Sequence, residues 1–102
     1  MMVVVAGHAP IHPAARRSVI QAAATMRSLT INEPGCITYR FSFALDAADD
    51  LLLIEAWVDR KALAQHLASP HFADFAQTLR SAIRGPASFT RYEIAHASPL
   101  FD

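Results

Sequence analysis

The sequence lacks a second cysteine, a long apolar run and an excess of charge of either sign. Its one thiol, Cys36, can form no internal disulfide, which predicts a reducing, cytoplasmic location. No apolar run approaches the roughly 20 residues of a membrane span, and residues 1–6 lack the positive region of a signal peptide. Nine Lys and Arg balance nine Asp and Glu without a basic cluster, which argues against a nucleic-acid partner.

Apolar side chains, by contrast, are abundant. They make up 53% of the 102 residues, against 18% for charged residues. This length argues for a single domain over residues 1–102. A domain of this size has a small interior, so the apolar excess predicts a dimer interface, an apolar pocket, or both.

Hydrophobic periodicity predicts four strands and three helices. Strands are predicted from apolar runs and from alternation, at 2–6, 36–45, 51–58 and 89–97. Helices are predicted from apolar residues spaced three or four apart, at 14–31, 60–68 and 71–84. Residues 7–13, with two prolines, are predicted to be a connection and 46–50 a turn. Asp59 and Ser69 precede the last two helices and are residue types that cap helix N-termini.

This order predicts an α+β, ferredoxin-like βαββαβ fold with an antiparallel four-stranded sheet and helices on one face. Strand 51–58 is apolar at both alternating sets of positions, so neither of its faces is expected to lie in water. A second copy of the sheet is the simplest way to cover the face that the helices leave open. The sequence therefore predicts a homodimer whose sheets pack face to face.

An acid and an indole stand close together at the end of this apolar strand. Glu55 and Trp57 are two residues apart and therefore point to the same face of the sheet. Helices that follow carry His66, His71 and Phe72, and they are able to cover that face. Such a place can enclose a small apolar molecule beside a few polar groups.

These residues belong to a longer ordered set with compatible spacing: Glu33-Pro34-Gly35-Cys36, Tyr39, Glu55-Ala56-Trp57, Asp59, Ala62-Leu63, His66, Ser69, His71-Phe72 and Phe75. The set resembles the antibiotic biosynthesis monooxygenase family, a branch of the dimeric α+β barrel superfamily. The resemblance implies a dimeric α+β barrel and a cofactor-independent monooxygenase acting with O₂ on a small phenolic or quinol-like compound. It is less specific for activity, since the family also contains haem-degrading enzymes, an isomerase and proteins of unknown role.

The sequence argues against the haem-degrading branch. Members of that branch carry an asparagine late in the first strand and a histidine on the last helix. Here the first strand is followed by Gly7-His8, and Ala76 occupies the position of the haem-ligating histidine. Haem iron is not held without an axial ligand, so no haem is expected.

Cofactor-free oxygenation needs groups that remove a proton, hold the resulting anion and exclude water. We expect His66 to be the catalytic base and Tyr39 a catalytic polar contact to a substrate oxygen. The predicted substrate-binding residues are Trp57, Glu55, His71, Phe72, Phe75 and Arg91.

Each polar candidate also has a structural interpretation. His66 and His71 can be surface residues of their helices, and Tyr39 and Trp57 can be packing residues. An acid in an apolar strand is either paired or has a raised pKa. Arg40 or Arg91 on neighbouring strands is the expected partner for such a pair. Cys36 is expected to be a packed strand residue.

No metal site is predicted. His66 and His71 are five residues apart with Pro70 between them, so they are not expected to share a helix face. His8 and His12 lie in a segment predicted to be a loop. Two other functions stay open on the same fold: a non-catalytic dimeric ligand-binding or stress-response protein, and an isomerase of a small hydroxy-ketone.

Overall fold

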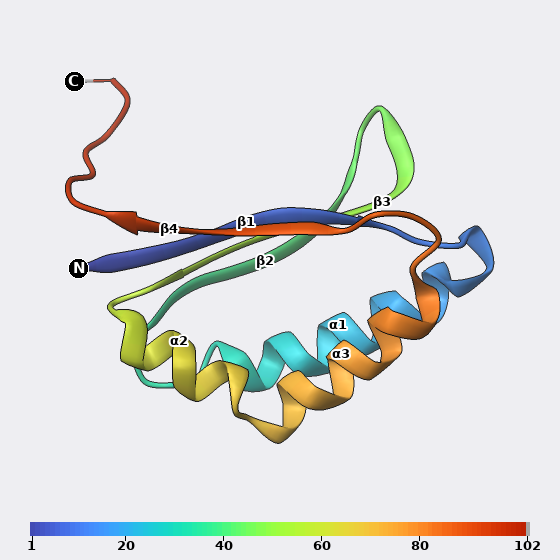
Figure 1. Ribbon diagram of the computed structural model, residues 1–102, viewed down its shortest axis with the longest axis horizontal. Helices are drawn as coiled ribbons and strands as arrows, with labels where there is room; N and C mark the ends of the chain where they lie inside the picture. Colours follow the sequence, from blue (N-terminus) through green and yellow to red (C-terminus); the bar gives the residue numbers. More distant parts are fainter. Residues whose placement is uncertain (102) are drawn as a thin grey trace.

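The computed structural model describes residues 1–101 and places three helices on one side of an antiparallel sheet (Figure 1). The strands are β1 (Met2–Pro10), β2 (Cys36–Ala44), β3 (Ala47–Trp57) and β4 (Ser88–Ile94), in the order β2-β3-β1-β4. The helices are α1 (Arg16–Thr30), preceded by a short 3₁₀ helix (Pro13–Ala15), α2 (Arg60–Leu67) and α3 (Pro70–Ala82). The predicted α+β ferredoxin-like fold is confirmed. None of the helices within residues 1–101 is long and apolar enough to cross a membrane.

β1 and β3 are longer than predicted. β1 continues through residues 7–10, which were expected to form a connection, and β3 begins inside the expected turn at 46–50. The two strands pair without interruption from Val3 opposite Trp57 to Pro10 opposite Asp50. Hydrogen-bonded pairing between the two strands thus outweighs the local preference of glycine and proline for loops and turns. Position 7 of this strand is a glycine because the backbone of β4 passes very close to it. A Cβ there would lie 2.1 Å from the Ser88 carbonyl oxygen.

The face of the sheet that meets the helices carries the core. α1 buries one stripe of residues spaced three or four apart, Val19, Ala23, Met26 and Thr30, which agrees with the periodicity from which helix 14–31 was predicted. It packs with the following buried side chains of the sheet and of α3: Val3, Ala9, Tyr39, Leu51, Trp57, Phe75 and Leu79. Burial of apolar area, at about 25 cal/mol per Å², is the main favourable term for this layer.

The opposite face of the sheet is not covered by any element of residues 1–101 (Figure 1). The register places Val4, Ala6, Ile54 and Tyr92 on this face. Ile54 is 48% exposed and Tyr92 50% exposed. We call this surface the open face.

Two helix caps confirm their predictions and set the geometry of the site. The Asp59 carboxylate accepts a hydrogen bond from the Ala62 backbone N–H at 2.9 Å and so starts α2. The Ser69 hydroxyl accepts one from the Phe72 backbone N–H at 3.2 Å and starts α3, with Pro70 as its first residue. The chain turns sharply between the two helices. His66 in the last turn of α2 and His71 in the first turn of α3 are thereby brought together.

Candidate active site

A carboxylate joins the two histidines. Glu33 lies in the turn between α1 and β2, which Gly35 closes with a φ of 84°. One oxygen of Glu33, Oε2, lies 2.7 Å from His66 Nδ1 and 2.9 Å from His71 Nε2. A carboxylate only accepts hydrogen bonds, so both imidazoles direct N–H groups at it.

Tyr39 continues the network toward the sheet. Its hydroxyl lies 3.2 Å from His66 Nε2, the ring nitrogen that Glu33 does not use. Because His66 Nδ1 donates to Glu33, Nε2 of the neutral ring is an acceptor, and the Tyr39 O–H donates to it. His66 thus connects a partly exposed carboxylate to a phenol buried at the sheet.

Glu55 and Trp57 lie beside this network, as their shared strand face predicted. Trp57 Nε1–H donates to Glu55 Oε1 at 2.8 Å. The indole stacks on the His66 ring, with centroids 4.9 Å apart and planes 29° apart. Tyr39 stands directly opposite Glu55 in the β2–β3 register. The two carboxylates, two imidazoles, phenol and indole therefore form one connected cluster.

Burial sets the charge states of the cluster. It lowers the pKa of His66, which is fully buried, although the nearby Glu33 opposes this shift. Burial also raises the pKa of Tyr39 well above its usual value, and Glu55 adds to the effect. The pKa of Glu55 is raised by burial too, against the opposing hydrogen bond from Trp57. At neutral pH the His66–Tyr39 pair is therefore a neutral imidazole and a protonated phenol.

A cavity of about 370 Å³ lies between the sheet and helices α2 and α3. Its walls are mostly apolar, and three polar side chains line it: Tyr39, Glu55 and Arg91. The apolar lining residues are Val5, Leu53, Leu63, Leu67, Phe72, Phe75, Ala76, Leu79 and Phe89. This volume lies within the range of small-molecule sites.

Five of the eight predicted site residues line this cavity: Tyr39, Glu55, Phe72, Phe75 and Arg91. The other three, His66, His71 and Trp57, are outside its lining. His66 is connected to the cavity through Tyr39, so a role of His66 as a base toward a molecule in the cavity would run through that phenol.

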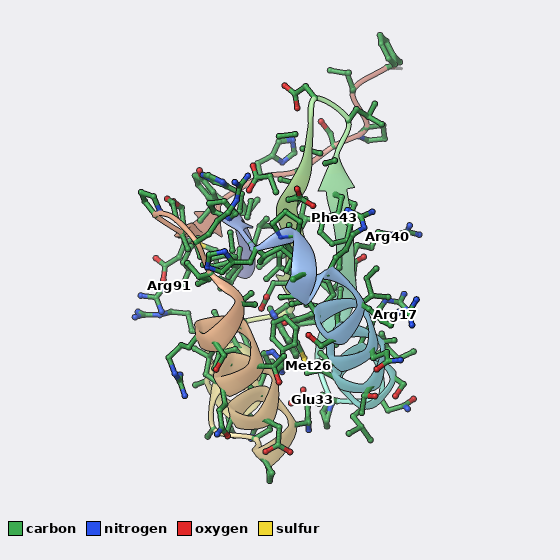
Figure 2. All side chains as sticks on the ribbon, turned by 90° about the vertical axis from the view of Figure 1, so that its right-hand side faces the viewer. Arg17, Met26, Glu33, Arg40, Phe43 and Arg91 are labelled. Atoms are coloured by element: carbon green, nitrogen blue, oxygen red, sulfur yellow. The ribbon has the colours of Figure 1, made fainter. Side chains whose placement is uncertain are left out.

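The expected ion pair between Glu55 and Arg40 or Arg91 is wrong. Arg40 pairs in register with Ile54 and so lies on the open face, and Arg91 is two strands away from Glu55. Figure 2 shows these two arginines projecting at opposite sides of the molecule. Glu55 has Trp57 as its partner instead. His66 and His71 lie on different helices and share no helix face, as predicted. The break between the helices nevertheless places both rings against Glu33, so the structure offers a set of possible metal ligands where the sequence predicted none.

Glu33 is the site residue that the prediction of catalytic and binding residues missed. Its contacts to His66 and His71 span 33 and 38 residues of sequence, so no local pattern marks them. Its place in the Glu33-Pro34-Gly35-Cys36 segment was the only available signal. Cys36 is partly buried, and burial raises the pKa of its thiol, which agrees with a packed strand residue.

Removing the charge of Glu55 is expected to stabilise the protein at pH values above the ordinary carboxyl pKa of about 4.3. The folded-state pKa of Glu55 is raised, so its contribution to stability is complete below the unfolded pKa of about 4.3 and is lost as pH rises through the folded value. Glu55→Gln keeps an acceptor for Trp57 but carries no charge. Urea unfolding should show a gain for this variant that grows with pH. Glu93→Gln, at an exposed residue paired with Arg60, is the control and should show no such growth.

The chain matches the sequence profile described as antibiotic biosynthesis monooxygenase over residues 2–78. The uncharacterised protein sll1783 of Synechocystis sp. is 33% identical over 100 residues, which covers 96% of this chain and 67% of that protein. This chain therefore belongs to the antibiotic biosynthesis monooxygenase family.

Solved structures agree with the fold. Rv0793 from Mycobacterium tuberculosis superposes with a TM-score of 0.88 at 24% identity, covering 97% of this chain and all of that one. A structure described as an antibiotic biosynthesis monooxygenase superposes with a TM-score of 0.83 at 25% identity, covering 94% of this chain and 100% of that one.

Proposed function

We propose that the protein is a cofactor-independent monooxygenase that oxidises a small phenolic or quinol-like compound with O₂. Family membership supports an oxidoreductase of this type. The observation that carries the proposal is the cavity, whose mostly apolar lining includes the polar side chains of Tyr39, Glu55 and Arg91. Such a lining accepts a flat aromatic ring, and Tyr39 and Glu55 can meet its hydroxyl.

Proton removal in this proposal runs through Tyr39. The substrate hydroxyl donates to the Tyr39 oxygen while the Tyr39 O–H donates to His66 Nε2. Transfer along both hydrogen bonds leaves a substrate anion in the cavity and an imidazolium at His66. Glu33, 2.7 Å from the other nitrogen of His66, stabilises that positive charge. His66 and Glu33 are thus positioning residues that act through Tyr39.

The anion supplies the electrons for oxygen. A quinol that reacts with O₂ gains one oxygen atom and loses two hydrogens, and the second oxygen atom leaves as water. The substrate loses four electrons and O₂ gains four, so the balance requires no other reductant. A substrate that fills the cavity packs against the apolar lining, including Phe72 and Phe75, and this packing keeps water from the reactive anion.

Oxygen uptake with a panel of quinols and polyphenols tests the proposal, with product mass recorded. Tyr39→Phe should lower kcat/KM by about 10- to 100-fold, the effect of losing one hydrogen bond to a charged group. The phenylalanine keeps the ring contacts with Phe41 and Trp57. Tyr92→Phe, on the open face, is the matched control and should leave the rate unchanged. A rate for Tyr39→Phe equal to wild type would contradict the role of the phenol.

The same polar side chains of the cavity suit a second reaction, isomerisation of a small hydroxy-ketone. Glu55 and Tyr39 lie opposite each other there, as a carboxyl and a phenol able to exchange protons with neighbouring oxygens. That reaction consumes no oxygen. Substrate conversion at an equal rate in air and under nitrogen would favour it over oxygenation. Binding without conversion would favour a ligand-binding protein.

We also propose that two copies associate through the open face. Val4, Ala6, Ile54 and Tyr92 place apolar atoms together on a sheet surface that nothing in residues 1–101 covers. Packing a second sheet on this face removes that surface from water at little conformational cost. Each cavity lies on the helix side of its own sheet, so the dimer leaves both cavities accessible.

A further inference from the structure

One cluster of side chains brings together possible metal-ligand atoms that the proposed oxygenation does not use as ligands. His66 Nδ1, His71 Nε2 and a carboxylate oxygen of Glu33 all lie within 4.8 Å of one another. Two imidazoles and one carboxylate are a donor set that proteins use for zinc and similar ions. We propose that Glu33, His66 and His71 bind a divalent transition-metal ion of the zinc type, and that the ion switches the oxygenation off. The proposed switching by the ion rests on the proposed function.

The three donors need only a small adjustment. Their 2.7 Å and 2.9 Å contacts are those of hydrogen bonds, while bonds of about 2.1 Å to a tetrahedral ion separate ligands by roughly 3.4 Å. His66 is held by Trp57 and Tyr39 and stays in place. Glu33 lies in a turn and His71 in the first turn of α3, with side chains 15% and 18% exposed. Movement of these two ligands by about 0.5–0.7 Å is enough to admit an ion.

An ion can reach the cluster from solvent. A groove of about 330 Å³ between α1 and α3 has His71 on its wall. The carboxylate of Asp74, one helical turn after His71, lines the same groove and attracts cations. Water from this side can complete a four-coordinate shell, since the protein supplies three ligands.

Metal binding reverses one hydrogen bond. In the metal-free protein His66 carries its proton on Nδ1, facing Glu33, and accepts from Tyr39 at Nε2. An ion takes the Nδ1 lone pair, so the proton moves to Nε2 and that nitrogen becomes a donor to the Tyr39 oxygen. Tyr39 then has no acceptor at His66 for its own proton. No electron is transferred, and the path of the substrate proton through Tyr39 to His66 is closed.

Titration of metal-free protein with Co²⁺ tests the site without any substrate. We expect visible absorption bands of four-coordinate cobalt, saturating at one ion per chain and displaced by Zn²⁺. Trp57 is the only tryptophan and stacks on His66, so its fluorescence should be quenched along the same curve. His71→Ala and Glu33→Gln should each raise the dissociation constant at least tenfold. His8→Ala, which removes an exposed histidine paired with Asp50, is the control and should bind as wild type does.

The site would be overturned if cobalt gave no saturable bands, or if His71→Ala and Glu33→Gln bound it as tightly as wild type. A circular dichroism spectrum and melting curve for each variant show that it is folded. The switch is tested separately, by inhibition of oxygen uptake with Zn²⁺. The half-inhibiting concentration should rise in His71→Ala by the factor found for cobalt, and Zn²⁺ without effect on a saturated site would overturn the switch. Cobalt binding without any oxidised substrate would leave the metal site intact and count against the oxygenase.

Discussion

Replacing Trp57 by alanine is expected to lower the free energy of unfolding by about 3–5 kcal/mol. Trp57 is fully buried and is the largest side chain of the core that is so enclosed. Its removal leaves a void beside His66 and takes the N–H donor from Glu55. Glu55 then keeps a buried oxygen with a lost partner, which adds to the cavity cost. A domain of this size has only about 5–15 kcal/mol of stability, so the variant should lose a large fraction of it.

Urea unfolding followed by far-UV circular dichroism measures this, since the only tryptophan is lost in the variant. Trp57→Phe is the comparison. It keeps an aromatic ring against His66 and Tyr39 but has no N–H, so it should lose clearly less stability than alanine. A cost below about 1 kcal/mol for alanine would mean that the neighbouring side chains collapse into the space, contrary to the close packing found here.

The stability of the molecule and the chemistry proposed for it depend on the same indole. Trp57 fixes the plane of His66 by stacking and holds Glu55 by a hydrogen bond. Glu55 and Tyr39 are polar residues of the cavity lining, and Tyr39 leads back to His66. A change at Trp57 therefore reaches the cavity through two separate contacts. For Trp57→Phe, the loss of kcat/KM expressed as a free energy should therefore exceed the loss in the free energy of unfolding.

The sequence predicted the layer arrangement because that depends on periodicity, which is local. Alternation placed Glu55 and Trp57 on one face, and the cap residues Asp59 and Ser69 placed the breaks between the helices. The lengths of β1 and β3 were missed because pairing between strands some forty residues apart decided them.

Most residues of the candidate site were predicted from the sequence, but the contacts that join them were not. The set contained both histidines, Tyr39 and Glu55, yet the carboxylate that organises the histidines was absent from it. A turn residue such as Glu33 has no partner in its own segment, so only the folded arrangement reveals its role. The same holds for the convergence of His66 and His71, which depends on the angle between two helices.

Ile54→Glu is expected to abolish association of the proposed dimer. Ile54 lies on the open face in the middle of β3, opposite Ala6 on β1 and Arg40 on β2. It is 48% exposed in the single chain, so a glutamate there is solvated in the monomer and causes little loss of folding. In the dimer the charge would be buried, at a cost of several kcal/mol for each copy. With two copies affected, the dissociation constant should rise by at least about 100-fold.

The chain supplies a matched control for this test. Ile20 on α1 is 47% exposed, an exposure nearly equal to that of Ile54, but it lies on the helix side of the molecule. Sedimentation velocity over a range of concentrations should show a dimer for wild type and for Ile20→Glu, and a monomer for Ile54→Glu. A monomeric wild type at every concentration would exclude the dimer itself. A dimer that persists in Ile54→Glu would place the interface elsewhere, and the apolar open face would then need another partner.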